Sequence, residues 1–136
     1  MELIVDANVL MSALISTEGK TYDLILNGTI KLFSPEFLLE EVEEHKKEIL
    51  SKSGLSDSDF ELFLSLISSQ IEFIPHTEFK KYASEAEKIT PDIDDSDYFA
   101  LALKLRWGIW SNDKKLKQQN KVKVYSTTEI ISLIQS

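Results

Sequence analysis

The stretch Glu2-Leu-Ile-Val-Asp6-Ala-Asn8-Val-Leu-Met-Ser12 decides how the rest of the chain is interpreted. It opens with a continuous apolar run at residues 3–5, which is typical of a strand that is covered on both faces. The run ends on Asp6, and open α/β sheets form their ligand crevice at the carboxyl ends of the strands. Asn8 and Ser12 follow one helical turn apart. A single acid at a strand end most often forms a turn, so the meaning of Asp6 depends on whether other carboxylates reach the same edge.

Apolar runs of strand length alternate with stretches of helical periodicity along the whole chain. Besides the first run, we expect strands at residues 30–33, 71–74, 107–111 and 122–125. Helical patterns fill the intervals, and two of them separate the second strand from the third. This alternation predicts right-handed βαβ crossovers. The expected fold is therefore α/β: a three-layer α/β/α sandwich with a mainly parallel five-stranded sheet, formed by a single domain over residues 1–136.

Several helices are predicted from their end signals and their periodicity. Ser34, followed by Pro and Glu, favours a helix that starts there and runs to about Ser51, with His45 on its buried side. Another helix is expected at residues 77–89. Residues 98–105 are apolar almost all round, so we expect this helix to be central and buried.

The composition limits the chemistry that is available. The 136 residues include no cysteine, which excludes disulfides, thiolate metal sites and cysteine nucleophiles within this sequence. The sequence shows neither a basic leader followed by an apolar run nor a stretch of about 20 apolar residues, so we expect a cytoplasmic protein without membrane contact. The net charge of −8 argues against wholesale coating of nucleic acid.

The positive charges are concentrated in one part of the chain. Residues 104–123 hold seven of the fifteen Lys and Arg residues and a single acid, Asp113. Lys114, Lys115 and Lys117 directly follow this acid. They form either a solvated face or a patch that contacts phosphate groups beside an acidic site, and the sequence leaves both interpretations open.

Four acids fall where the predicted fold can bring them together. Asp6 and Asp113 each follow a strand, Asp95 opens the central helix, and Glu41 lies about two turns into the helix after the second strand. Clustered carboxylates repel one another, and a bound cation relieves that repulsion. Ligand sets made only of oxygen suit Mg²⁺ or Mn²⁺. Each acid alone fits a turn, a helix cap or a solvated face, so only their joint occurrence indicates a metal site.

In this order, the residues resemble the motifs of PIN-domain nucleases, in particular small stand-alone members of VapC type. The matching elements are Asp6-x-Asn8-x-x-x-Ser12, Glu41 within Pro35-Glu-Phe-Leu-Leu-Glu-Glu41-Val, Asp95 before an Ala/Leu-rich helix, and Ser111-Asn112-Asp113. The resemblance extends over nearly the whole chain. It implies a metal-dependent endoribonuclease in which a metal-activated water attacks an RNA phosphodiester bond without a covalent enzyme intermediate.

The resemblance also implies a role for individual residues. Asp6, Glu41, Asp95 and Asp113 would be the catalytic carboxylates around Mg²⁺ or Mn²⁺. Asn8, Ser12 and Ser111 would orient the carboxylates of Asp6 and Asp113. Lys114, Lys115 and Lys117 would contact RNA phosphates if they are not simply solvated. Ser111 stands where the family often has Thr, a change that keeps the hydroxyl.

Two of the ligand positions have neighbouring candidates. Glu40 and Glu41 are adjacent and point about 100° apart on a helix. We choose Glu41 because it fits the family spacing. Among Asp94, Asp95 and Asp97, we choose Asp95 for its distance to the Ala/Leu-rich helix. Asp97 is then the candidate for an auxiliary metal ligand, and Asp94 the candidate for the helix N-cap.

The resemblance suggests partners, and two other functions compete with it. An RNA substrate, an inhibiting antitoxin protein and a homodimer are expected for a toxin of this type. A phosphoacceptor signalling domain would need adjacent acids after the first strand, an acceptor Asp after the third and a Lys after the fifth, whereas the third strand here ends in Pro75. A catalytically idle PIN-like scaffold that binds proteins is the stronger alternative, because RNA must approach a molecule with a net charge of −8.

Overall fold

A five-stranded sheet in which every neighbouring pair is parallel forms the centre of the computed structural model, which describes residues 1–135. The strands are β1 (Glu2–Val5), β2 (Lys31–Pro35), β3 (Ile71–Ile74), β4 (Gly108–Trp110) and β5 (Val124–Tyr125). Their order across the sheet is β3-β2-β1-β4-β5. The expected α/β sheet is therefore confirmed.

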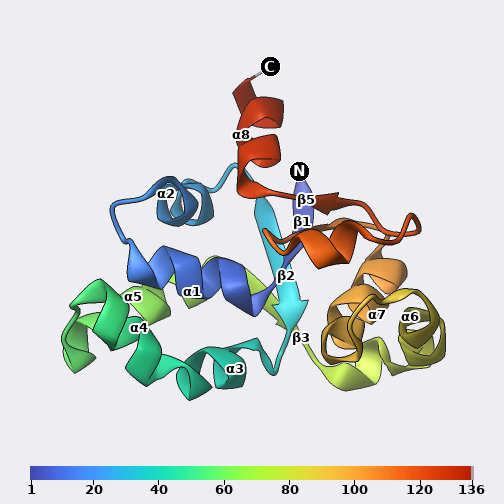
Figure 1. The fold of residues 1–136 in the computed structure, drawn as a ribbon, viewed down its shortest axis with the longest axis horizontal. Coiled ribbons are helices and arrows are strands. Elements are labelled where there is room, and N and C mark those ends of the chain that lie inside the picture. The colour runs from blue at the N-terminus through green and yellow to red at the C-terminus, as the bar shows by residue number, and fades with distance from the viewer. Residues whose placement is uncertain (136) are drawn as a thin grey trace.

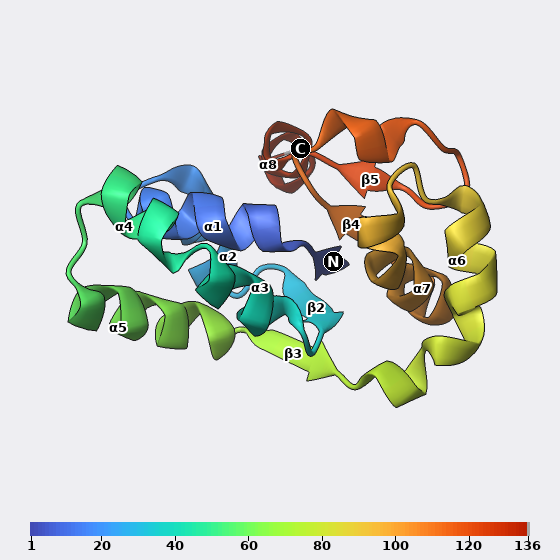
Figure 2. The same ribbon diagram turned by 60° about the horizontal axis from the view of Figure 1, so that its bottom comes forward.

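Helices cover both faces of this sheet. The α-helices are α1 (Ala7–Ile15), α2 (Lys20–Leu26), α3 (Leu38–Glu44), α4 (Lys46–Ser53), α5 (Asp57–Ser68), α6 (Ala83–Ile89), α7 (Ser96–Leu105) and α8 (Thr127–Gln135). Helices α1 to α5 gather on one side, whereas α6 and α7 lie on the other, and α8 projects from the body (Figures 1 and 2). The arrangement is the predicted three-layer α/β/α sandwich. Within residues 1–135, no helix combines the length and the apolar character needed to cross a membrane.

The core is continuous through the middle strands and the helices that pack on them. Leu3, Ile4 and Val5 of β1 are completely or almost completely buried, as expected for a strand with a neighbour on each side and helices on both faces. Helix α7 buries every residue from 98 to 102. Its predicted central position is confirmed, because the apolar character all round this segment leaves no face suited to water.

The strand order creates a topological switch point between β1 and β4. The chain runs from β1 outwards through β2 to β3, then returns through α6 and α7 to form β4 on the other side of β1. Val5 of β1 lies in register with Trp110 of β4, so the two strands end side by side. Open α/β sheets bind ligands in the crevice at this point, beyond the carboxyl ends of the strands.

The segment after the second strand differs from the prediction. Ser34 does not cap a helix: it lies within β2, is fully buried, and its hydroxyl donates to the Val5 carbonyl over 3.1 Å. The helix begins only at Leu38 and is divided at His45, where φ is −101° and ψ is 12°. His45 is exposed, and its Nδ1 lies 2.9 Å from the Glu41 carbonyl oxygen, so its predicted burial is wrong. The pairing of β2 with β1 and β3 outweighed the local helix signal of Ser34.

The expected helix at residues 77–89 is also shorter than predicted. Two 3₁₀ turns, His76–Glu78 and Lys80–Tyr82, precede α6. Phe79 lies between these turns with φ of −125° and is 1 % exposed. Burial of this ring holds the backbone out of the helical conformation, and regular helix starts only after it.

Candidate functional site

Asp6 lies at the switch point as the residue that leads from β1 into α1. It occupies the N-cap position of α1, where its Oδ1 accepts the Val9 N–H over 3.0 Å. Its carboxylate also accepts a hydrogen bond from the Ser111 side chain. Only 3 % of Asp6 is exposed. Burial raises its pKa from 3.8 to about 6, the two hydrogen bonds oppose that rise, and the charges of Asp95 and Asp113 add to it.

Ser111 joins the ends of the two neighbouring strands. It directly follows β4, is 1 % exposed, and its Oγ accepts the Asp113 N–H over 3.1 Å. Because the same hydroxyl donates to Asp6, one side chain fixes both the Asp6 carboxylate and the backbone at Asp113. The Asp113 carboxylate accepts the Lys115 N–H over 3.0 Å and caps the 3₁₀ turn Lys114–Lys117.

Asp95 reaches this edge from the loop that precedes α7. It ends the 3₁₀ turn Ile93–Asp95 and takes the N-cap position of α7, yet its side chain forms no capping hydrogen bond. Burial raises its pKa from 3.8 to about 6, and the charges of Asp92, Asp113 and Asp94 add to the rise. Asp95 also interacts electrostatically with Asp6. Asp95 is thus a half-buried carboxylate that interacts with like-charged neighbours, and it receives no hydrogen bond within residues 1–135.

Glu41 approaches the same group of acids from α3. It is half-buried, whereas Glu40 is exposed. Its Oε1 accepts the Tyr98 hydroxyl over 3.1 Å. Burial raises the pKa of Glu41, the bond from Tyr98 opposes the rise, and the charge of Asp95 adds to it. Of the two adjacent candidates, Glu41 is therefore the half-buried one, and it interacts with Asp95.

The remaining candidates near Asp95 take different places. Asp94 is exposed, and its N–H donates to Asp92 Oδ1 over 3.0 Å. The prediction that Asp94 caps the helix is wrong, because Asp92 caps the 3₁₀ turn and Asp95 holds the N-cap position of α7. Asp97 is half-buried in the first turn of α7, and its side chain forms no hydrogen bond or ion pair within residues 1–135. Its role as an auxiliary ligand stays a prediction.

Asn8 and Ser12 lie on the exposed side of α1. They line a hollow between α1 and α4 together with Met11, Ile15 and Lys52. In the described part of the chain, neither side chain hydrogen-bonds to Asp6, whose polar contacts come from Val9 and Ser111. Of the three side chains expected to orient the carboxylates, only Ser111 makes that contact here.

The predicted phosphate-contacting lysines flank the site. Lys114, Lys115 and Lys117 are all exposed. The Lys117 ammonium forms an ion pair with Glu129 of α8. Lys114 and Lys117 border a surface hollow of about 520 Å³ that also includes Ser111 and Asp113. The basic side chains thus adjoin the strand-end carboxylates, although one of them is already neutralised within the chain.

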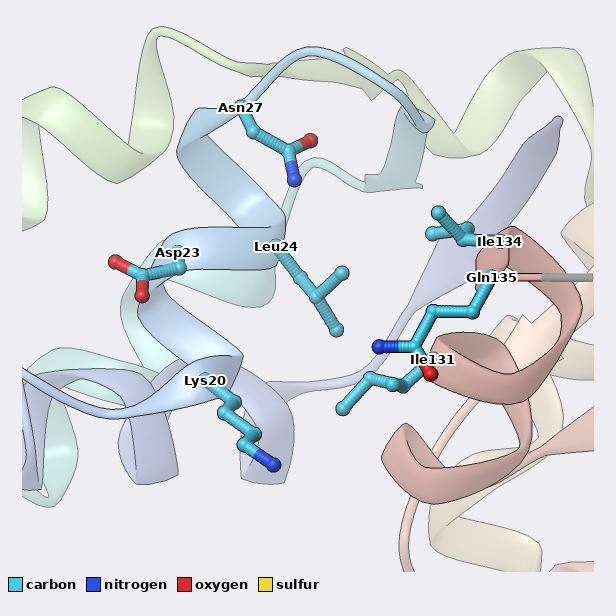
Figure 3. Close-up of a pocket in the computed structure, with 7 residues that line it drawn as sticks. All are labelled: Lys20, Asp23, Leu24, Asn27, Ile131, Ile134 and Gln135. Carbon is cyan, nitrogen blue, oxygen red and sulfur yellow. The ribbon is translucent and has the colours of Figure 1, made fainter.

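A third hollow lies between α2 and α8 and is separate from the acids. It has a volume of about 240 Å³, and Leu24, Ile131 and Ile134 face one another across it (Figure 3). Polar side chains surround them: Lys20, Asp23, Asn27 and Gln135. None of the predicted catalytic residues lines this hollow.

The donor set at the switch point suits a hard divalent cation. The candidate ligands offer carboxylate oxygens only, and they repel one another electrostatically in several pairs: Asp6, Glu41, Asp95 and Asp113. Within residues 1–135, no three Asp, Glu or His side chains already converge closely enough to enclose an ion. Mg²⁺ in proteins keeps several waters and is held through one or two carboxylates, so this looser grouping fits a hydrated ion.

Tyr98 belongs to this site although its sequence position suggests only a core residue. Its ring is 1 % exposed, and its hydroxyl joins α7 to Glu41. The hydroxyl also accepts a hydrogen bond from the Ala7 N–H, next to Asp6. A buried tyrosine hydroxyl requires polar partners, so a tyrosine one turn after a candidate ligand in an apolar helix is the signal that could have identified it.

Comparisons with known proteins agree with the fold. A family model described as PIN domain matches residues 4–132. No curated protein matches the chain. Among solved structures, the chain is similar to the crystal structure of VapBC2 from Rickettsia felis bound to a DNA fragment from their promoter, with a TM-score of 0.63 and 14 % identity. That likeness covers 93 % of this chain and 98 % of the other, and at this identity it shows a shared fold.

Proposed function

The chain is a member of the PIN-domain family, whose members are generally nucleases, and we propose that it is a metal-dependent endoribonuclease that hydrolyses RNA phosphodiester bonds. One observation carries the proposal: the carboxylate of Asp6 is buried, and Asp95 repels it. Ser111 hydrogen-bonds both to this carboxylate and to the backbone N–H of Asp113. A buried carboxylate with like-charged neighbours is costly in the metal-free state, and a cation offsets that cost.

The residues that would hold Mg²⁺ or Mn²⁺ are Asp6, Glu41, Asp95 and Asp113, with Asp97 as an auxiliary ligand. The bound ion supplies Lewis-acid chemistry, which lowers the pKa of water and neutralises charge at the phosphoryl group under attack. Ser111 keeps the Asp6 carboxylate oriented, and its acceptance of the Asp113 N–H holds the second strand end in place. These contacts prepare two of the four carboxylates before the ion arrives.

RNA binding would use the basic side chains beside Asp113. Lys114 and Lys115 are exposed, and no ion pair within residues 1–135 involves them. Phosphate contacts from such lysines position a nucleic acid without reading its sequence. They offset, close to the site, the repulsion that a net charge of −8 exerts on RNA.

The first experiment is the substitution Asp6→Asn. We expect Mn²⁺-dependent cleavage of RNA to fall by at least about 100-fold, because metal stabilisation of a phosphoryl transition state is worth several kcal/mol. Asp23→Asn, which changes an exposed acid of α2, serves as the matched control and should keep full activity. Unchanged Mn²⁺-dependent cleavage by Asp6→Asn, in a folded protein, would overturn the proposal.

A catalytically idle PIN-like scaffold is the second candidate. The observation that favours it is the absence, within residues 1–135, of three acidic or histidine side chains already gathered around a metal position. Calorimetric titration with Mn²⁺ separates the two functions. Saturable binding that Asp6→Asn weakens supports the nuclease, whereas no binding supports the scaffold.

The proposed partners follow from the family and from the similar structure. We propose that the protein acts in the cytoplasm as the toxin of a toxin–antitoxin pair and forms a homodimer. The similar structure from Rickettsia felis is a VapBC2 assembly. A small open reading frame directly upstream, whose product co-purifies with this chain and inhibits cleavage, would support the pair. Light scattering of the purified chain tests the dimer.

A further inference from the structure

The Tyr98 hydroxyl is a buried polar group that connects three elements of the site. Tyr98 lies in α7, and its hydroxyl donates to Glu41 of α3 over 3.1 Å. The same oxygen accepts a hydrogen bond from the Ala7 N–H at the start of α1, next to Asp6. One hydroxyl therefore contacts α3 and α1 from the helix that Asp95 opens.

The ring and the hydroxyl of Tyr98 do different things. The ring packs against Phe37, with centroids 5.6 Å apart and planes at 57°, and this apolar contact needs no hydroxyl. The hydroxyl supplies the single hydrogen bond that the Glu41 carboxylate receives within residues 1–135. A phenylalanine would reproduce the ring packing and lack only the contacts to Glu41 and Ala7.

Glu41 needs such a contact in order to stay at the site. Its side chain has several rotatable bonds, and fixing them costs conformational entropy. Asp95 repels it, which favours rotation of the carboxylate towards solvent. The hydrogen bond from Tyr98 occupies Oε1 and opposes both effects, while Oε2 receives no hydrogen bond within residues 1–135.

We propose that Tyr98 is a positioning residue: its hydroxyl holds the Glu41 carboxylate at the switch point, where that carboxylate helps to bind the divalent cation. This inference rests on the proposed function, because it assigns Tyr98 a role in the same metal site. Partners that orient metal ligands from outside the coordination sphere typically contribute about 10–100-fold in metal affinity or activity. Tyr98 acts within that range, through Glu41 and not through contact with the ion.

The test compares Tyr98→Phe with Tyr22→Phe by calorimetric titration with Mn²⁺. Tyr22 is the matched control, since it is also buried and packs edge-on against a phenylalanine, Phe63. We expect Tyr98→Phe to weaken Mn²⁺ binding by about 10–100-fold, and Tyr22→Phe to leave it unchanged. Cleavage by Tyr98→Phe should recover towards the original rate at saturating Mn²⁺, which a general loss of structure would not allow.

A double-mutant cycle shows whether Tyr98 acts through Glu41. In a Glu41→Ala background, Tyr98→Phe should weaken Mn²⁺ binding no further. Equal losses in both backgrounds would overturn the inference, as would unchanged Mn²⁺ binding by Tyr98→Phe while Glu41→Ala and Asp6→Asn weaken it. If Glu41→Ala and Asp6→Asn also leave Mn²⁺ binding unchanged, the proposed metal-dependent function fails as well. Thermal unfolding without metal confirms that each variant is folded.

Discussion

The candidate site consists of two halves that are held in different ways. The strand-end half comprises Asp6, Ser111 and Asp113, and the helix half comprises Glu41, Asp95 and Tyr98. In the strand-end half, both carboxylates accept backbone N–H groups, from Val9 and Lys115, and Ser111 links them. In the helix half, Asp95 accepts no capping hydrogen bond and Glu41 is held by Tyr98.

This difference shows which part of the site the backbone fixes. The register between β1 and β4 sets the distance between the two strand ends, and the hydrogen bond from Asp6 N–H to the Trp110 carbonyl extends that pairing by one residue. Helix α3 has no such support, since it is seven residues long and begins without a side-chain cap. The strand-end half is therefore preorganised, whereas the helix half depends on side-chain contacts between elements.

The largest expected effect in the metal-free protein concerns the buried charge of Asp6. Because the folded-state pKa of about 6 exceeds the ordinary 3.8, the folded protein binds more protons between these pH values. The free energy of unfolding therefore falls as the pH rises from about 4 to 6, by roughly 2–3 kcal/mol for this group. Asp6→Asn should remove that loss and be more stable than the original protein at pH 7, as denaturant unfolding at several pH values would measure.

Saturating Mn²⁺ provides the control for this experiment. It should restore stability to the original protein at pH 7 and add little to Asp6→Asn. If Asp6→Asn is less stable than the original protein at pH 7 without metal, the carboxylate contributes more through its hydrogen bonds than its burial costs. The charge of the Asp6 carboxylate would then stabilise the metal-free protein, contrary to the expectation that its burial destabilises it.

A smaller effect is expected when the link within the strand-end half is removed. Ser111→Ala deletes the donor to Asp6, but the Val9 N–H remains, just as Asp113 keeps the Lys115 N–H. We expect Mn²⁺ affinity to fall by about 10-fold, the lower end of the usual range for such partners. Tyr98→Phe, which removes the one hydrogen bond to the Glu41 carboxylate within residues 1–135, should weaken Mn²⁺ binding more. If Ser111→Ala lost more Mn²⁺ affinity than Tyr98→Phe, the strand-end half would depend more on side-chain contacts than the helix half, contrary to our expectation. Ser111→Thr is the control: it keeps the hydroxyl and should bind Mn²⁺ normally.

The smallest effect concerns the basic flank, which leaves both halves intact. Glu129→Gln frees Lys117 from its ion pair, while a glutamine can still complete the capping box with Ser126 at the start of α8. Exposed ion pairs are worth about 0.2–1 kcal/mol, so RNA affinity should rise less than about 5-fold. The dependence of log affinity on log salt should steepen by up to about one unit. An unchanged salt dependence would show that Lys117 does not contact phosphate.

Much of the fold follows from local patterns that the tertiary structure did not override. The apolar runs of β1 and β3 and the all-round apolar α7 lie where the sequence predicts them. The failures have a common cause. Ser34 and Phe79 carry local signals for helix, but pairing in the sheet and burial in the core decided their conformation.

The sequence by itself determined the fold class and predicted the candidate ligands. Strand ends in a parallel sheet share one edge, so Asp6 and Asp113 could be paired from the order of elements alone. Only the tertiary structure shows how the helix acids approach them. Glu41 lies in α3, Asp95 ends the 3₁₀ turn before α7, and the Tyr98 hydroxyl bonds to Glu41 across 57 residues of sequence. Such long-range contacts depend on packing, which no local pattern encodes.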